Sequence, residues 1–206
     1  METPDATSLI ERKRMLARQR IVQAADELFA AKGFEGVSVT DIARSADVGR
    51  STFFRYFGDK AEVVFAREQE MLDAITELAA HGPALAARTP AEAIEQLRPI
   101  VLELCERASV NSNGYALHYE LIGKHLELRA RDALKTQLIG ERLSEVLISR
   151  GTEASIAVFA GQIALACCQT GRERAKNPQA LTVETHAAFD QALALGAVTS
   201  GAPRRH

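Results

Sequence analysis

Residues 38–60 of the chain read SVTDIARSADVGRSTFFRYFGDK, and this stretch decides the fold of the N-terminal region. Ser38 stands three residues before Asp41, which is the spacing of a helix N-cap and its capping-box partner. The segment Asp47-Val48-Gly49 must end the helix that follows, because Asp tolerates a left-handed backbone and Gly tolerates any conformation. The stretch therefore predicts a short helix, a tight turn and a second short helix.

The second helix, predicted over about 50–57, has two different faces. Phe53 and Phe57 are four residues apart and share the face that we expect to pack on a core. The remaining side chains carry two guanidinium groups, two small hydroxyls and a phenol, and none is acidic. Such groups donate hydrogen bonds to phosphates and to base edges, so this face is typical of DNA recognition. An exposed basic helix without a nucleic-acid role is the alternative.

The flanking segments also indicate binding to a nucleic acid. Asp59 and Glu62 form a second capping-box pattern, and Lys60 begins the next helix, where a cation is unfavourable unless an anion such as phosphate binds. Between Arg12 and Arg20 there are five basic residues and no acidic one. We interpret this run as an arm that follows the phosphate backbone, with a solvated helix end as the alternative. The predicted DNA-binding residues are Arg18, Thr40, Arg50, Ser51, Thr52, Arg55, Tyr56 and Lys60.

The run from Ile21 to Lys60 resembles the DNA-binding region of the TetR family of bacterial regulators. The resemblance is carried by AADELFAAKGFEGVSVTDIA, by the turn ADVGRS, and by TFFRYFGDK with its closing lysine. Asp47 stands where the family usually has Gly. Phe54 stands where it usually has Tyr, so no phosphate contact is expected from position 54. The resemblance implies a dimer that pairs through its last two helices and releases DNA when a ligand binds.

The composition is that of an ordinary soluble, all-helical protein. The 206 residues are 47% hydrophobic and 25% charged, with a net charge of −2, and no stretch alternates in the manner of a strand. A net charge near zero does not argue against DNA binding, because the distribution of charge matters more than its sum. We find no membrane-spanning segment and no signal peptide, and expect a cytoplasmic protein.

The predicted organisation has three parts: a disordered leader at 1–10, a helix-turn-helix DNA-binding domain at 11–80 with its motif at about 39–58, and a helical effector-binding and dimerisation domain at 81–206. After the motif, helices are predicted at about 60–80, 90–108, 115–150, 153–174 and 183–198. The first helix is expected over about 11–31. A loop is predicted at 111–114, a break near Gly123 or His125, and a tail at the end of the chain.

The helix predicted over 153–174 is apolar on two sides, so it must be buried on two sides. Ile156, Phe159, Ile163 and Cys167 form one stripe, which we expect to face the domain's own core. A second stripe of small residues would let a helix of another copy approach, with a central helix inside a monomer as the alternative. The predicted dimer-interface residues are Ala157, Gly161, Ala164, Cys168, Ala188 and Ala192.

The regions around 98–125 and 156–167 supply many aliphatic side chains and few aromatic ones. We expect them to hold a small, mostly apolar effector, for which an acyl-CoA-like compound is the candidate; an ordinary core is the alternative. In that interpretation Arg98 and the two histidines would meet a polar or anionic head. The predicted ligand-binding residues are Arg98, Leu102, Cys105, His118, Leu121, Ile122, His125, Phe159 and Ile163.

Catalytic and metal sites are not predicted. The chain has no phosphate-cradling glycine loop and no zinc-type His-Glu pairing, and His118 and His125 are seven residues apart, whereas helical metal sites use three or four. The three cysteines show no disulfide or metal spacing, so we expect small buried residues in a reducing compartment. No cofactor is predicted, and the chain is not expected to be an enzyme.

These observations favour a ligand-responsive transcription regulator, a repressor that acts as a homodimer on a palindromic operator. Two other classes remain as alternatives. One is a helical enzyme or small-molecule carrier with an accessory DNA-binding unit, which would need a convergent polar constellation in the C-terminal bundle. The other is a nucleoid protein, whose binding would be insensitive to DNA sequence.

Overall fold

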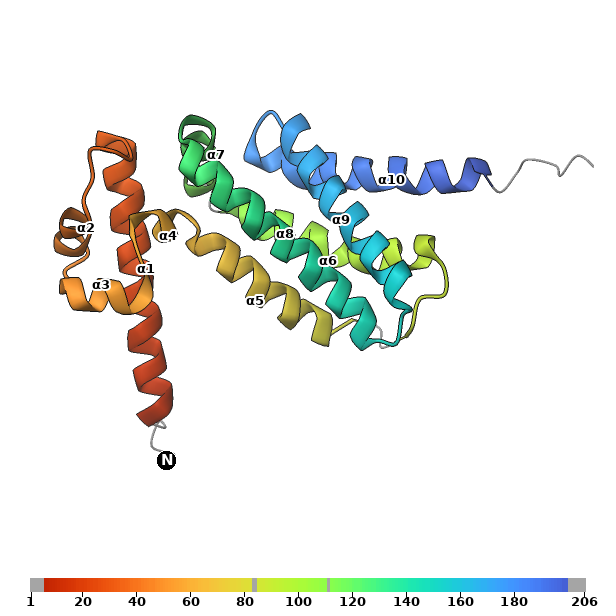
Figure 1. Cartoon of the computed structure of the whole chain (residues 1–206), viewed down its shortest axis with the longest axis horizontal. Coiled ribbons are helices and arrows are strands. Elements are labelled where there is room, and N and C mark those ends of the chain that lie inside the picture. The colour runs from red at the N-terminus through yellow and green to blue at the C-terminus, as the bar shows by residue number, and fades with distance from the viewer. Residues whose placement is uncertain (1–5, 83–84, 111, 200–206) are drawn as a thin grey trace, which may run out of the picture. The chain divides into compact units, whose positions relative to one another are not determined.

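A computed structural model describes residues 6–82, 85–110 and 112–199, and within these ranges every regular element is a helix (Figure 1). Contacts divide the chain into two units. The first unit comprises residues 1–67 and 117–128, and the second comprises 68–116 and 129–206. This division differs from the predicted domain boundary at residue 80, because the first unit ends earlier and takes up a later segment.

The first unit is built on one long helix. Figure 1 shows α2 and α3 beside α1. The helices are α1 (Ala6–Lys32), α2 (Val39–Ser45), α3 (Arg50–Tyr56) and α4 (Lys60–Val64). Because α1 begins at Ala6, residues 6–10 are helical and not the disordered leader that we expected, while residues 1–5 lie outside the described range. The core between these helices includes Ile21, Phe34, Ile42 and Phe53, each at most 1% exposed.

The predicted local signals of this unit are present in the structure. Ser38 caps α2, and Asp41 completes the capping box by accepting from the Ser38 backbone N–H at 3.1 Å. Asp47 adopts the left-handed conformation, with φ of 51°, as the turn requires. Asp59 caps α4 by accepting from the backbone N–H of Glu62 at 2.8 Å. These caps fix where each short helix begins.

A segment from later in the chain completes the first core. Residues 117–128 include the end of α7 (Ser112–Lys124) and the start of α8 (Leu126–Ser149), and the break between these helices at His125 was predicted. Leu121, Ile122 and Leu128 are buried among the side chains of α1 to α4. The predicted loop at 111–114 is wrong at Ser112–Gly114, which are helical, and Asn111 lies outside the described residues.

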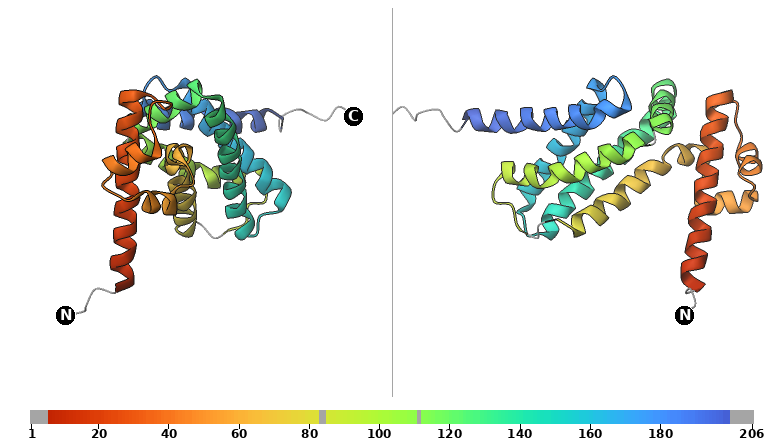
Figure 2. Two further views of the ribbon diagram at one scale, coloured as in Figure 1. Left: turned by 60° about the vertical axis from the view of Figure 1, so that its left-hand side comes forward. Right: turned by 180° about the vertical axis from the view of Figure 1, so that it is seen from behind.

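The second unit is a helical bundle in which α6, α9 and α10 pack against one another (Figure 2). Its helices are α5 (Ala66–Ala80), α6 (Pro90–Val110), most of α8, α9 (Ala154–Arg174), the 3₁₀ helix η1 (Pro178–Ala180) and α10 (Leu181–Thr199). The predicted start of α6 is confirmed, since Thr89 accepts from the Glu92 N–H at 3.2 Å and Pro90 is the first helical residue. The predicted fourth helix, 60–80, is interrupted at Phe65.

The small residues of α9 face the interior of the protomer, which corrects the predicted dimer interface. Ala157 and Ala164 are fully buried, and Gly161 is buried against α8, where a Cβ would lie 2.8 Å from the Gly140 carbonyl oxygen. On α10, Ala188 is 6% exposed, while Ala192 and Cys168 pack against the same core. A side chain fully covered by its own chain cannot meet a partner, whereas Cys168 and Ala192 are half-buried and their place in a dimer interface stays a prediction. The alternative of a central helix describes this stripe better.

The other stripe of α9 is correspondingly more open than predicted. Phe159 was expected in the core and is 51% exposed, while Cys167 is buried and Ile156 and Ile163 are partly buried. Contrary to our expectation from the sequence, α9 is long and apolar enough to cross a membrane by length and composition alone, with a mean hydropathy of 1.4. Its packing among α6, α8 and α10 is that of a core helix.

Candidate nucleic-acid interface

The candidate interface is the outer face of α3. Its inner face is anchored by Phe53 and Phe57, which are 0% and 5% exposed and whose ring centroids are 5.8 Å apart. Gly49 stands at the N-cap in an extended conformation, and α3 is seven residues long. A helix of two turns is not stable alone, so the two aromatic anchors and the neighbouring helices hold it in place. The predicted inner face of α3 is confirmed.

Both guanidinium groups of α3 are exposed and lie over aromatic rings. The Arg50 Cζ atom is 5.9 Å from the Phe54 ring centroid, and the Arg55 Cζ atom is 5.5 Å from the Tyr56 ring centroid. Arg55 also donates to the Thr52 hydroxyl at 3.4 Å. Stacking on a ring restricts the movement of a long side chain. It does not use the N–H groups of the guanidinium, which can still donate hydrogen bonds to another acceptor. Such a fork fits phosphate or the acceptor edge of guanine.

The predicted hydroxyl groups surround these arginines to different extents. Ser51 is exposed on α3, and Thr40 is exposed in the first turn of α2. Thr52 and Tyr56 are half-buried, and Tyr56 packs partly against the first core. Small hydroxyls at helix starts can donate to phosphate while allowing a close approach of the helix.

Lys60 is engaged inside the first unit, a contact that the sequence did not predict. Its Nζ donates to the carbonyl oxygens of Phe34 at 2.9 Å and Val37 at 3.3 Å, and it lies 4.2 Å from the Phe34 ring centroid. The cation at the start of α4 is therefore stabilised by carbonyl groups of the loop before α2. Its first role in the structure is to hold that loop.

Arg18 is likewise held by the first unit. Its Nη2 donates to the Ala66 carbonyl oxygen at 2.8 Å, and its Cζ atom lies 5.5 Å from the Phe57 ring centroid. This residue ties α1 to the end of α3 and to the start of α5. Arg18 thus has a structural contact in the free chain, and its predicted phosphate contact stays a prediction.

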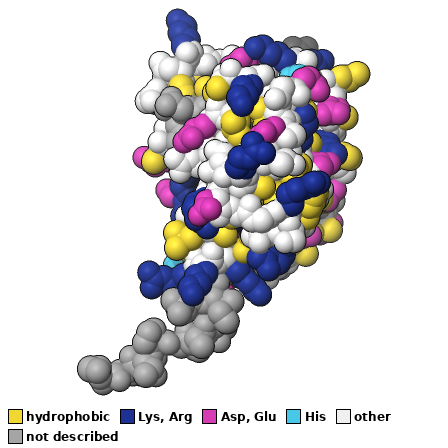
Figure 3. Space-filling view, turned by 90° about the vertical axis from the view of Figure 1, so that its left-hand side faces the viewer, with side chains coloured by type: hydrophobic (Ala, Val, Ile, Leu, Met, Phe, Trp, Pro, Cys, Tyr) yellow, Lys and Arg dark blue, Asp and Glu magenta, His cyan; other side chains and the backbone are white. Residues whose placement is uncertain are grey.

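The rest of the basic run is exposed. Arg12, Lys13, Arg14 and Arg20 have open side chains on α1, and from residue 11 onward Ile21 is the first buried residue of this helix. Figure 3 views this side of the molecule and shows Lys and Arg side chains spread over it, with a group at its lower end and some Asp and Glu among them. The surface that carries α1 to α3 therefore bears several exposed Lys and Arg side chains.

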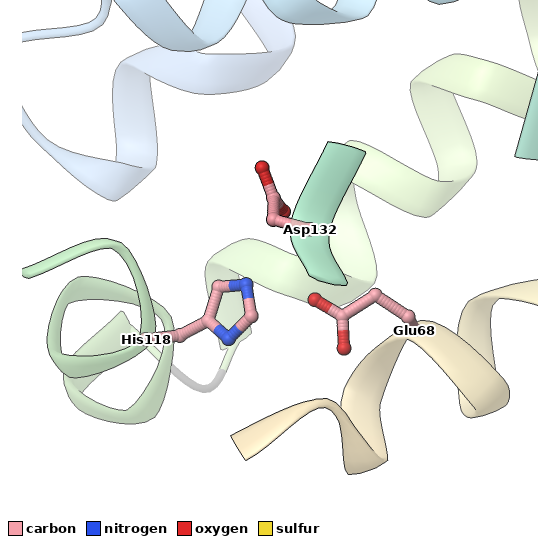
Figure 4. Close-up of side chains that lie close together, drawn as sticks. All are labelled: Glu68, His118 and Asp132. Atoms are coloured by element: carbon pink, nitrogen blue, oxygen red, sulfur yellow. The ribbon is translucent and has the colours of Figure 1, made fainter. Parts of the chain in front are cut away.

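Two histidines that we assigned to ligand binding belong to the first unit. His118, whose ring projects from α7 in Figure 4, is 4% exposed, and its Nδ1 lies 3.0 Å from the Val64 carbonyl oxygen. The His125 Nδ1 lies 3.5 Å from a Glu35 carboxylate oxygen, and its ring packs on Phe34. These contacts fix α7 and its end to the DNA-binding unit, which no spacing in the sequence indicated.

The predicted ligand-binding residues are divided between the two units, and the pocket that they were expected to form stays a prediction. His118, Leu121, Ile122 and His125 belong to the first unit, and Arg98, Leu102, Cys105, Phe159 and Ile163 belong to the second. Arg98 forms ion pairs with Asp190 and Glu95, and its guanidinium holds the pKa of Asp190 below the ordinary value. A head-group site at Arg98 would have to displace these carboxylates.

Two acidic side chains of the second unit lie close together, although no sequence motif indicated this. Glu68 on α5 is buried and Asp132 on α8 is half-buried, and their carboxylate oxygens lie within 4.8 Å of one another (Figure 4). Neither residue belongs to the face of α3, and neither was selected from the sequence.

Known proteins resemble the chain in both sequence and fold. A sequence model of the family described as "Bacterial regulatory proteins, tetR family" matches residues 21–66. The HTH-type transcriptional regulator TcmR of Streptomyces glaucescens is 28% identical over 151 residues, which cover 72% of this chain and 66% of that relative. The HTH-type transcriptional regulator HbdR of Aromatoleum sp. is 36% identical over 56 residues, or 27% of this chain and 24% of that relative. The matched part is thus less than two thirds of either relative.

The likeness in fold extends over nearly the whole chain. The crystal structure of Thermus thermophilus FadR, a TetR-family transcriptional repressor in complex with lauroyl-CoA, has a TM-score of 0.55 and 24% identity. The alignment covers 92% of this chain and 97% of that one. At this identity the comparison establishes the arrangement of helices, and the matched region at 21–66 contains α2, α3 and α4 in full.

Proposed function

We propose that this chain, which belongs to the TetR family of bacterial regulatory proteins, is a sequence-specific transcription regulator that binds operator DNA through α3. The observation that carries the proposal is the outer face of α3. Arg50 and Arg55 are exposed there, each over an aromatic ring, on a helix that Phe53 and Phe57 anchor from behind. Arginine forks placed on a rigid helix are suited to reading base edges in the major groove.

The proposed regulator acts as a homodimer in the cytoplasm. TetR-family regulators act as dimers, and two-fold symmetry calls for two related half-sites in the operator. The residues that support pairing are large apolar side chains exposed on the last two long helices. These are Val158 and Phe159 on α9 and Val183 and Leu195 on α10, between 51% and 75% exposed.

The proposed effector is a small, mostly apolar molecule, with an acyl-CoA as the first candidate, and its binding would release DNA. Aliphatic side chains dominate the second core, and the Thermus protein of similar fold was crystallised with lauroyl-CoA. Three helices, α5, α7 and α8, each contain residues of both units. A ligand that favours one arrangement of the second unit could therefore shift the population of DNA-binding conformations through continuous helices.

Selection from randomised double-stranded DNA tests the proposal. The expected result is an enriched, near-palindromic sequence that recurs in the source genome, and loss of its binding in the Arg50→Ala/Arg55→Ala variant. Enrichment without a consensus would favour the nucleoid alternative and contradict the proposal. Long-chain acyl-CoAs and neutral hydrophobic compounds are then titrated against the complex with the selected site. If a hydrophobic compound other than an acyl-CoA releases the DNA, the proposed repressor function stands and only the proposed class of effector changes.

A further inference from the structure

Two thiols and one hydroxyl from three helices meet in the second unit. The Cys105 Sγ atom of α6 lies 4.0 Å from the Cys168 Sγ atom of α9 and 3.5 Å from the Thr185 Oγ1 atom of α10. Cys105 and Thr185 are 1% and 0% exposed, while Cys168 is half-buried. The thiol pair therefore lies at the edge of the core, where we expected only small buried residues.

We propose that Cys105 and Cys168 are a modification site, which a hydroperoxide converts into a reversible disulfide between α6 and α9. A disulfide bond is about 2.05 Å long, so the sulfur atoms would have to approach each other by about 2 Å. Rotation about the two Cα–Cβ bonds and small helix displacements can supply a movement of that size. Cys167 is not the partner, because consecutive residues of a helix point about 100° apart.

Hydrogen bonding makes the two thiols unequal. The pKa of Cys105 is lowered, first by its hydrogen bond with Cys168 and further by that with the Thr185 hydroxyl. The pKa of Cys168 is raised well above its ordinary value by its hydrogen bond with Cys105 and by burial. The lower pKa makes Cys105 the nucleophile of the proposed reaction, and Cys168 supplies the second sulfur atom.

The chemistry balances with one hydroperoxide. The Cys105 thiolate attacks the terminal oxygen of the hydroperoxide, the O–O bond breaks, and an alcohol leaves (water when the oxidant is hydrogen peroxide), so that Cys105 becomes a sulfenic acid. The Cys168 sulfur then attacks the Cys105 sulfur, the S–O bond breaks, and water leaves with the thiol proton. The two thiols lose two protons and two electrons in total, and the peroxide is reduced to the alcohol and water. A dithiol reductant reverses the reaction by thiol–disulfide exchange.

The disulfide would hold the second unit in one arrangement of helices. It joins residues 63 positions apart on two helices that pack together, and a cross-link of that span restricts the unfolded chain strongly. The expected consequence is a rise in Tm of roughly 5–10 °C on oxidation, if packing remains unstrained. This consequence does not depend on DNA binding, so its failure would leave the proposed function untouched.

Mass spectrometry of the full-length protein tests the proposal. After treatment with hydrogen peroxide, blocking of free thiols and tryptic digestion without reduction, we expect a cross-linked pair of the peptides 89–107 and 151–172. The intact protein should have lost two hydrogen atoms and should accept one alkyl group instead of three. Dithiothreitol should restore the original mass and all three reactive thiols.

Variants identify the partner within the second peptide. Cys105→Ala and Cys168→Ala should each abolish the cross-link, whereas Cys167→Ala, the matched control from the neighbouring position, should retain it. Thr185→Val keeps the side-chain volume but removes the hydroxyl, so it should raise the pKa of Cys105 and slow oxidation by roughly 10-fold at neutral pH. Phenylarsine oxide, which bridges two close thiols without oxidation, reports on the wild-type pair independently of any substitution. A cross-link through Cys167, a disulfide between protomers, or stoichiometric sulfinic acid without a cross-link would each overturn the assignment.

Discussion

Gly161 of α9 lies against Ser144 of α8, so that a Cβ atom at position 161 would overlap the Ser144 hydroxyl. That Cβ would also lie 2.8 Å from the carbonyl oxygen of Gly140, which accepts the Ser144 hydroxyl at 2.9 Å. Small residues on both helices therefore allow their backbones to approach closely. This contact fixes which side of α9 is turned into the protomer.

The first prediction concerns this contact. Gly161→Ala should destabilise the second unit by about 1–3 kcal/mol, because the added methyl group meets backbone and a bonded hydroxyl that cannot both move away. Alanine is otherwise the better helix former by roughly 1 kcal/mol, so a loss of stability reports the clash and not the propensity. Urea unfolding followed by far-UV circular dichroism measures the difference.

Gly123→Ala is the matched control. Gly123 lies in α7, and a Cβ there would have nothing within 4 Å. The substitution should leave the unfolding midpoint unchanged or raise it, as the helix propensity alone requires. Equal effects of the two substitutions would show that α9 is not packed on α8 in the way described.

Local features of the fold were predictable because each depends on residues close in the chain. Ser38 and Asp41 form a cap by themselves, Asp47 supplies the left-handed turn, and the spacing of Phe53 and Phe57 assigns the inner face of α3. The resemblance to a family added the expected function of that face. None of these inferences needed the second unit.

The remaining features depend on partners that a single helix does not reveal. Both stripes of α9 are apolar, so periodicity could not tell which one is inside; Gly140 and Ser144 on another helix decide it. Lys60 and Arg18 have long side chains that reach carbonyl oxygens distant in sequence, and those acceptors carry no residue signature. The sequence of residues 117–128 likewise indicates only a helix of the C-terminal bundle. Their burial in the first core shows that they belong to the first unit.

The second prediction concerns the proposed dimer. Phe159→Asp should convert the homodimer to a monomer, because a carboxylate would be buried between apolar surfaces, while folding is retained at a site that is 51% exposed in the protomer. Analytical ultracentrifugation measures the mass, and circular dichroism the fold. Leu85→Asp, at a residue of the second unit that is 71% exposed and precedes α6, should leave the dimer intact. A dimeric Phe159→Asp protein would exclude this face of α9.

The third prediction concerns pH. The pKa of Asp41 is lowered from 3.8, first by its hydrogen bond with the Ser38 hydroxyl and then by that with the Ser38 backbone N–H. A lowered carboxylate pKa contributes stability that is present above about pH 3.8 and is lost as the pH falls through the lower folded value. Asp41→Asn should therefore be less stable than the wild type at pH 7, and the difference should shrink below pH 3.8. Thermal unfolding between pH 2.5 and pH 7 measures this, and a difference that stays constant over the range would contradict the role of ionised Asp41.

The fourth prediction separates DNA contacts from structural cations. Arg50→Ala should weaken binding to the selected operator by about 1–3 kcal/mol and relax specificity, with an unchanged Tm, because the guanidinium is exposed and lies over the Phe54 ring. Lys60→Met should instead lower the Tm, since the Phe34 and Val37 carbonyl oxygens lose their charged donor. Fluorescence anisotropy with operator and scrambled duplexes, beside thermal unfolding of each variant, provides both measurements.

Arg142→Ala controls for the loss of one positive charge. Arg142 is exposed on α8 in the second unit and pairs with Glu145 at 3.2 Å, so its removal should change neither the Tm nor the preference for operator over scrambled DNA. If Lys60→Met weakens the binding of operator and scrambled DNA alike at an unchanged Tm, then Lys60 leaves its carbonyl acceptors to bind phosphate. If Arg50→Ala lowers the affinity for both duplexes equally, Arg50 contacts the DNA backbone, and the reading of bases must be assigned to another residue of α3.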